Sequence, residues 1–289
     1  NAMSYGGSTM FLETGEQLPV HDMLKGIAVA SANDGCVAMA EHLTGSETAF
    51  VEEMNKRAKE LGMNNTNFVN ACGLDAQDHY STARDISVMA KELMKHPEIY
   101  NYTTIWTDYL RGGETQLANT NKLIRYYPGA TGLKTGYTSK AGHCLSATAQ
   151  RDGLELIAVV MGAESSQIRF AACKSMLDYG FANYALVTPD SAGGTVPVKL
   201  GKDQEIGVIP GEIPQFLIDK AQRGSVTTEM ILEPTVTAPV SAGQKLGTLT
   251  VRVGEQVLAQ IPMVAQSAVE RLTLGDLIVL VLKQTAMAK

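Results

Sequence analysis

The distribution of proline and glycine divides the chain into two parts of different character. After Tyr184, these residues interrupt short β-branched and apolar runs every few positions, without helical periodicity between them. Residues 247–261 contain two such runs around Gly254-Glu255, a spacing that predicts a β-hairpin. We therefore predict a small all-β domain at 186–265, followed by a helical tail at 266–289.

Residues 3–185 mix helical and strand patterns. Capping residues followed by apolar positions at helical spacing predict helices that begin after Thr44 and Thr82, and a third helix is predicted at 166–179. Residues 144–161 form two apolar runs around a polar turn, which predicts a hairpin whose second arm is buried on both faces. The mixture indicates an α+β fold.

Composition excludes several classes of protein. The 289 residues are 45% hydrophobic and 19% charged, which is typical of a globular chain and not of a disordered or coiled-coil one. A formal charge of −6 argues against a nucleic-acid-binding protein. The four cysteines and five histidines show no metal-ligand spacing, so we expect no metal, no cofactor and cysteines that fill the core.

The first candidate site motif is Ser31-Ala-Asn33, at a break before a predicted helix. Serine and asparagine at such a break are most often helix N-caps. The functional interpretation is a hydroxyl that relays protons beside an amide that holds substrate. The motif alone does not decide between these two interpretations.

The second candidate motif is Lys134-Thr135-Gly136. It is not a nucleotide-binding P-loop, because such a loop needs glycine immediately before the lysine, where this chain has Leu133. The motif is either an exposed strand end with a turn glycine or a strand edge that binds substrate. In the second case, Gly136 lets a ligand approach the main chain closely.

The third candidate is Arg169, at the start of the third predicted helix. An arginine in such a position is usually a solvated helix residue. Its alternative role is to bind a carboxylate with its planar guanidinium group.

Taken together, Ser-x-Asn followed about 100 residues later by Lys-Thr-Gly resembles two motifs of the penicillin-recognising serine enzymes. Other segments are similar to the low-molecular-weight D-alanyl-D-alanine carboxypeptidases, namely residues 10–15, 45–51, 60–68, 73–75, 80–85, 119–121 and 177–181. The resemblance implies a β-lactamase/transpeptidase-like domain, incomplete at its N-terminus, and a β-rich C-terminal module. It also implies a secreted hydrolase of the cell envelope that removes the terminal D-alanine of peptidoglycan stem peptides through an acyl-enzyme.

The resemblance assigns roles in catalysis to three residues. Ser31 would pass a proton to the departing amine, and Asn33 would hold the substrate amide. Lys134 would supply positive charge near the developing oxyanion.

Four further residues would bind substrate. Thr135 and Arg169 would bind the free C-terminal carboxylate of the substrate. Tyr137 would contribute its backbone N–H to the oxyanion hole, beside the open backbone at Gly136.

One departure from the family is serious, because its nucleophile lies in a Ser-x-x-Lys motif. No lysine in this sequence has a serine three positions before it. Because Met3 corresponds to a point inside the family's catalytic domain, we expect a truncated chain without nucleophile or export signal, inactive as given. Core surface exposed by truncation should lead to self-association.

Two alternatives and one membrane interaction follow. The chain could be a truncated paralogue that binds peptidoglycan or a partner without cleaving it. A class A β-lactamase is disfavoured, because such an enzyme lacks an additional domain and segment 64–73 has no acidic residue for deacylation.

The tail from Leu272 could begin an amphipathic membrane anchor, with Lys283 and Lys289 facing anionic lipid. In the full-length enzyme, β-lactam antibiotics would be ligands.

Overall fold

The computed structural model describes residues 2–4 and 6–279. Its contacts divide the chain into two compact units, Asn1–Ala182 and Asn183–Lys289. The first mixes helices with antiparallel strands and the second is almost entirely β, as the α+β prediction required.

The helices of the first unit begin at side-chain caps where the sequence offers them. Thr82 accepts a hydrogen bond from the backbone N–H of Asp85, as predicted, whereas the cap near Thr44 is Ser46, which accepts from the N–H of Ala49. The helices are α1 (Val20–Ala30), α2 (Asn33–Thr44), α3 (Glu47–Glu60), α4 (Ala83–Leu93), α5 (Tyr100–Thr103), α6 (Leu123–Tyr126) and α7 (Ser166–Asn183).

A three-stranded antiparallel sheet forms the centre of this unit, in the order β3 (Ala130–Thr138), β4 (Gly142–Arg151), β5 (Leu154–Ala163). The predicted hairpin is β4–β5. The expectation that β5 is buried on both faces was wrong, because only Leu154 and Ala158 of its ten residues are buried. A separate hairpin joins β1 (Thr107–Leu110) to β2 (Thr115–Ala118).

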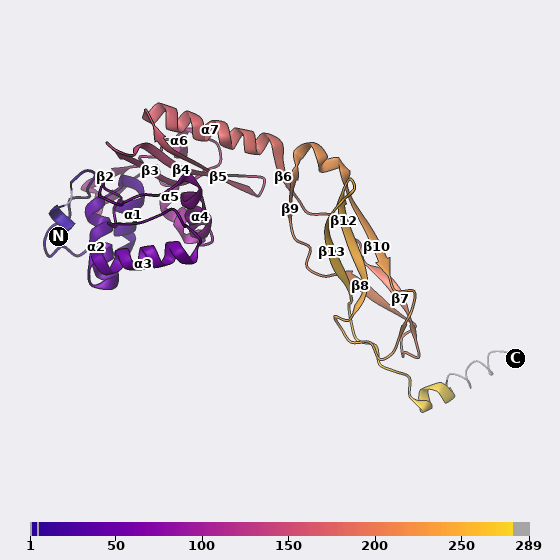
Figure 1. Ribbon diagram of the computed structural model, residues 1–289. Helices are drawn as coiled ribbons and strands as arrows, with labels where there is room; N and C mark the ends of the chain where they lie inside the picture. Colours follow the sequence, from indigo (N-terminus) through magenta and orange to yellow (C-terminus); the bar gives the residue numbers. More distant parts are fainter. Residues whose placement is uncertain (1, 5, 280–289) are drawn as a thin grey trace. The chain divides into compact units, whose positions relative to one another are not determined.

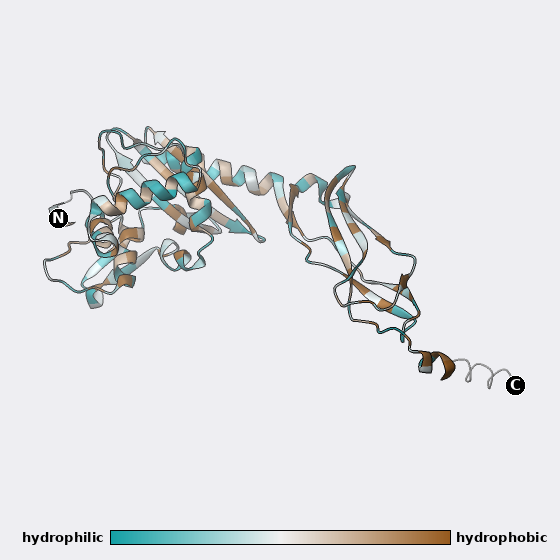
Figure 2. Cartoon of the chain, turned by 60° about the horizontal axis from the view of Figure 1, so that its bottom comes forward, coloured by the Kyte–Doolittle hydropathy of each residue, from teal (hydrophilic) through white to brown (hydrophobic). Residues whose placement is uncertain are grey.

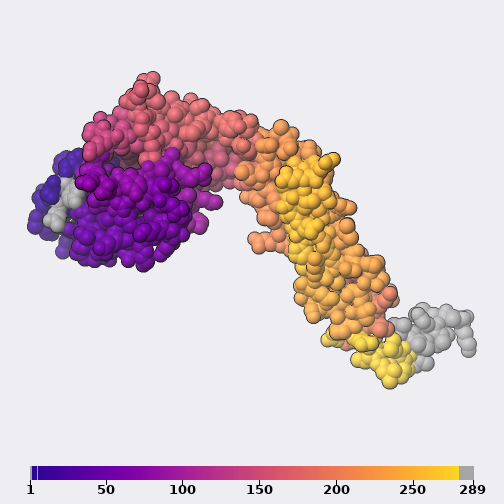
Figure 3. Space-filling model, viewed as in Figure 1, coloured from indigo at the N-terminus to yellow at the C-terminus, as the bar shows by residue number. Residues whose placement is uncertain are grey.

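Helices cover both faces of the sheet (Figure 1). α4 and α5 contact one face, while Cys173 of α7 contacts β4 and β5 from the other. α7 continues past Gly180, where the sequence predicted its end, because Gly180 faces the sheet and a Cβ there would lie 2.4 Å from Leu156 Cδ1. In space-filling view, the helical layer away from α7 forms a continuous surface, coloured indigo to purple (Figure 3).

The second unit contains a six-stranded sheet, ordered β10-β12-β13-β8-β7-β11, and the two-stranded pair β6–β9. The predicted hairpin at 247–261 is β12–β13. Apolar and polar residues alternate along these strands, so that one set forms the core (Figure 2). The strands are β6 (Tyr184–Val187), β7 (Gly194–Lys199), β8 (Glu205–Pro210), β9 (Phe216–Asp219), β10 (Val226–Leu232), β11 (Val236–Thr237), β12 (Lys245–Val253) and β13 (Gln256–Ala265).

The predicted helical tail begins later than expected. Residues 266–272 are not helical: Val269 and Arg271 form isolated β-bridges with Val240 and Gly201 of the same unit. A helical segment starts at Leu274, where Thr273 and Asp276 cap each other reciprocally. Among the described residues, no helix combines the length and apolar composition needed to span a membrane. The remainder of the proposed anchor, with Lys283 and Lys289, lies outside the described residues.

Candidate active site

Ser31 lies between two helices in an unusual backbone conformation. It is the C-cap of α1, with φ 64° and ψ 37°, and α2 begins two residues later. A non-glycine residue in this left-handed region is uncommon and is frequently found at functional sites. The N-cap interpretation of Ser31-Ala-Asn33 was therefore wrong, because Ala32 occupies the N-cap position of α2 and Asn33 is already helical.

Lys134 of β3 reaches Ser31 across a long sequence separation. Its Nζ donates to Ser31 Oγ at 2.8 Å and to its neighbour's carbonyl oxygen, Thr135 O, at 2.9 Å. Because the serine oxygen accepts a hydrogen bond from the lysine, the serine O–H remains available to donate to another group. This pair is the central feature of the site.

Burial lowers the pKa of the Lys134 ammonium to about 8; the Cys36 thiol opposes this shift and Arg169 adds to it. Lys134 should therefore lose its charge near pH 8, instead of at its ordinary value of 10.5. Between pH 8 and pH 10.5 the unfolded chain binds more protons than the folded chain, so the free energy of unfolding should rise with pH over this range. We expect an NMR titration of lysine side chains to show one midpoint near 8 that disappears in Lys134→Arg. A midpoint near 10 would contradict this.

Asn33 and its neighbour Asp34 hold the N-terminal segment against α2. Asn33 Nδ2 donates to Gly6 O at 2.7 Å, so this amide is directed toward that segment. The buried Asp34 carboxylate accepts from the backbone N–H groups of Met10, Leu12 and Gly35. Sequence reasoning singled out Asn33 but missed Asp34.

Thr135 is buried on β3 and faces a residue that sequence reasoning did not assign to the site. Its hydroxyl lies 2.6 Å from the Thr120 hydroxyl, and either oxygen can be the donor. The only signal in the sequence was that Thr120 lies within the segment 119–121, which resembles the family.

Arg169 binds the backbone of the same strand. Its guanidinium donates to Gly136 O at 2.7 Å and to Cys144 O at 3.1 Å, and its buried Nε has no partner among the described residues. Burial lowers the pKa of this group. Arg169 is thus not the solvated helix residue of the first interpretation, because it lies on the α7 face that packs against the sheet.

Gly136 and Tyr137 form an open part of the β3 edge. A Cβ at Gly136 would meet only Cys144 Cβ, at 3.8 Å, so no close protein contact requires glycine there. The Tyr137 side chain is 64% exposed and packs on His143, with ring centroids 4.4 Å apart. An extended ligand can therefore reach the backbone of this strand.

The three candidate motifs meet at β3. Ser31 and Lys134 touch directly. Thr135 and Gly136 occupy the next two positions along β3, and Arg169 donates a hydrogen bond to the carbonyl oxygen of Gly136. In the described part of the chain, the Asn33 side chain makes its hydrogen bond to Gly6 O and none to this group. Together they supply a hydroxyl that can donate a proton, an ammonium group and an exposed strand edge.

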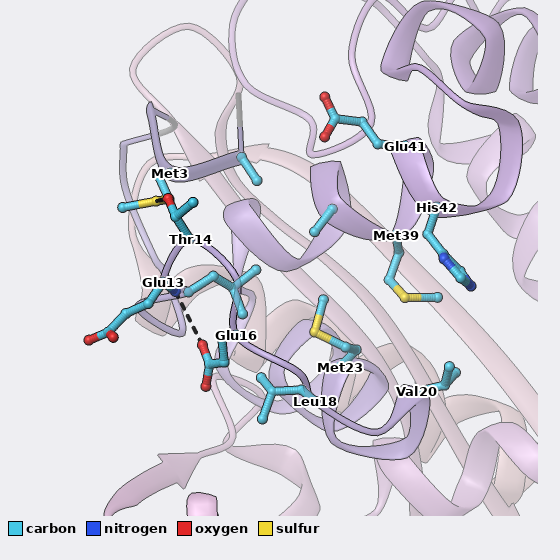
Figure 4. Close-up of a pocket in the computed structure, with 13 residues that line it drawn as sticks. Met3, Glu13, Thr14, Glu16, Leu18, Val20, Met23, Met39, Glu41 and His42 are labelled. Atoms are coloured by element: carbon cyan, nitrogen blue, oxygen red, sulfur yellow. Dashed lines mark hydrogen bonds between the residues drawn. The ribbon is translucent and has the colours of Figure 1, made fainter.

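One pocket lies apart from this arrangement. This pocket, of about 380 Å³, is lined on its apolar side by Leu18, Met23 and Met39, and includes none of the candidate residues (Figure 4). Within the described part of the chain, no three His, Cys, Asp or Glu side chains gather as metal ligands.

All four cysteines are free, and only Cys173 is fully buried, so the expectation of core cysteines was wrong for the other three.

Comparison with known proteins identifies the family of this chain. The D-alanyl-D-alanine carboxypeptidase family, Peptidase S11, matches residues 1–165, and the penicillin-binding protein 5 C-terminal domain matches residues 181–271. The chain belongs to the D-alanyl-D-alanine carboxypeptidase family. It is therefore a member of a family of serine peptidases, with a β-lactamase-like fold followed by a β-rich domain. The second match accounts for the additional domain, which a class A β-lactamase lacks.

Individual relatives support the assignment to this family. A D-alanyl-D-alanine carboxypeptidase of Bacillus subtilis (strain 168) is 43% identical over 278 residues, which cover 94% of this chain and 72% of the relative. The crystal structure of penicillin-binding protein 5 from Haemophilus influenzae has a TM-score of 0.69 at 30% identity, and covers 92% of this chain and 78% of that one. Penicillin-binding protein D2 from Listeria monocytogenes, crystallised with ampicillin, has a TM-score of 0.56 at 33% identity and covers 61% of this chain and 74% of that one.

Proposed function

We propose that this carboxypeptidase chain carries the substrate-binding side of a site that removes the terminal D-alanine from peptidoglycan stem peptides. The observation that supports this most directly is the contact between Lys134 and Ser31. In the reaction, an acyl-enzyme forms on a serine of a Ser-x-x-Lys motif and water then releases the shortened peptide. No such motif occurs in these 289 residues.

We assign the residues of the site the following roles, which their observed hydrogen bonds support for Ser31, Lys134 and Arg169. Ser31, which accepts from Lys134, donates its own proton to the departing D-alanine amine, and Lys134 stabilises negative charge on the reacting carbonyl. Tyr137 N–H contributes to the oxyanion hole. Thr135 donates its hydroxyl proton to the substrate carboxylate, and Arg169 provides long-range positive charge while it fixes the strand backbone.

The role proposed for Asn33 depends on a change of partner. Asn33 would hold the substrate amide after its side chain releases Gly6 O. Without a Ser-x-x-Lys motif, we propose that these residues bind stem peptides and do not cleave them. A paralogue that binds peptidoglycan without catalysis would behave in the same way.

A binding measurement tests this proposal directly. We expect NMR titration with an acetylated peptide ending in D-Ala-D-Ala to shift signals of β3, while the same peptide ending in L-Ala-L-Ala does not. Lys134→Met should abolish the shifts, and Lys245→Met, in the second unit, should leave them unchanged. Equal shifts with both peptides would refute the assignment of the site.

Ligands and location follow from the same proposal. The Listeria relative was crystallised with ampicillin, and we propose that β-lactams bind to the β3 edge of this protein as well. Because the substrate is peptidoglycan, the protein would act in the cell envelope. Attachment to the membrane surface through the tail is part of this proposal, and Leu274 and Ile278 are exposed there.

Self-association is a further part of the proposal. Edge strand β5 is ten residues long, has no charged side chain after Glu155, and pairs on one side only within the described structure. Unpaired, apolar edges of this kind associate with other strands. We expect light scattering to show a dimer or larger species that Val159→Lys makes monomeric, whereas a monomeric parent chain would contradict the idea.

A further inference from the structure

Thr120 is held rigidly beside the candidate site. It follows β2 and lies between two buried asparagines, of which Asn119 donates to the carbonyls of Thr103 and Ile105, and Asn121 donates to Gly132 O. The N–H of Thr120 donates to Val29 O in the last turn of α1, two residues before Ser31. The backbone of Thr120 is therefore fixed to both the helix that leads to Ser31 and the start of β3.

The hydroxyl groups of Thr120 and Thr135 form a pair with two possible arrangements. They lie 2.6 Å apart, and in the described structure neither has another hydrogen-bond partner. If Thr135 donates to Thr120, the only hydroxyl proton of Thr135 is already engaged in that hydrogen bond and cannot be donated to a ligand. If Thr120 donates to Thr135, the Thr135 proton is free for a ligand.

A carboxylate ligand selects the second arrangement, because an ionised carboxylate accepts hydrogen bonds only. Each hydroxyl in the series Thr120, Thr135, ligand then both accepts and donates, which strengthens the final bond to the charged oxygen. The same order exists next to this pair, where Lys134 donates to Ser31 and leaves the serine proton free.

We propose that Thr120 is a positioning residue that sets the preference of this site for a free C-terminal carboxylate. It acts by donating to Thr135, so that Thr135 presents its proton to the ligand. This inference depends on the proposed function, since it assumes that the ligand is a peptide with a D-alanine terminus.

The test compares two ligands and two variants of the 289-residue chain. The ligands are the acetylated D-Ala-D-Ala peptide and its C-terminal amide, with dissociation constants measured by NMR titration. Thr120→Val retains the shape of the side chain and removes its hydroxyl, whereas Thr120→Ser retains the hydroxyl. We expect Thr120→Val to weaken binding of the carboxylate peptide about tenfold, leaving binding of the amide peptide unchanged, and Thr120→Ser to behave like the parent.

The possible outcomes distinguish a failure of this inference from a failure of the proposed function. If the parent chain prefers the carboxylate peptide and Thr120→Val retains that preference, the role of Thr120 is refuted and the proposed function stands. An equal loss for both ligands would also refute it, because a merely structural residue would have that effect. If the parent chain does not distinguish the two peptides, carboxylate recognition itself fails.

Discussion

The 289-residue chain should form no covalent adduct with fluorescent penicillin and should release no measurable D-alanine. Acylation needs a serine activated by a neighbouring base. Ser31, the serine that the structure places beside a lysine, accepts a hydrogen bond from the Lys134 ammonium, which has no lone pair with which to take up the serine proton. Removing the nucleophile from a well-studied serine protease lowers turnover roughly a millionfold. We expect a loss of that order relative to an intact relative.

The measurement is a gel assay of fluorescent penicillin with mass spectrometry of the intact chain. The Bacillus subtilis carboxypeptidase, assayed alongside, shows that the reagent is competent. An adduct on this chain would contradict the prediction, and its position would be informative. If Ser31→Ala removed it, Ser31 itself would be the nucleophile.

The second large effect concerns the stability of the first unit. Asp34→Ala should lower the free energy of unfolding by about 3 kcal/mol. The buried carboxylate accepts from three backbone N–H groups, and alanine leaves all three without that acceptor. Two of these donors belong to Met10 and Leu12, which would become detached from α2. Asp34→Asn should cost nearly as much, since its NH₂ group would face a backbone donor.

Urea unfolding, followed by circular dichroism, measures this difference. Glu52→Ala is the matched control, because Glu52 is an exposed carboxylate on α3 that forms no hydrogen bond or ion pair within the described structure. Its loss should change stability by less than about 0.5 kcal/mol. If Asp34→Ala unfolded at the same urea concentration as this control, the carboxylate would not be holding the segment. Near-ultraviolet signals would then show whether the 10–12 segment has moved.

Much of the secondary structure was predictable from the sequence because its signals are local. The cap at Thr82, the β4–β5 hairpin and the β12–β13 hairpin depend on residues a few positions apart, and all three are present. The errors arose where packing opposed a local rule. Gly180 normally ends a helix, but here it allows α7 to lie close to Leu156.

The site was only partly predictable. Short motifs identified Ser31, Lys134 and Arg169 because their residue types and order resemble a known family. Asp34 and Thr120 were not identified from the sequence, because each acts through hydrogen bonds to residues distant in sequence. No local pattern distinguishes them from an ordinary aspartate or threonine.

By itself, the sequence determined the family, the division into a mixed part and a β-rich part, and the chemical groups available for binding. Only the tertiary structure decided how those groups are charged and connected. A lysine acquires a lowered pKa when folding removes it from water, and it donates to a particular serine because β3 is placed against the end of α1. Burial and contacts between distant segments exist only in the folded chain, so no motif could specify them.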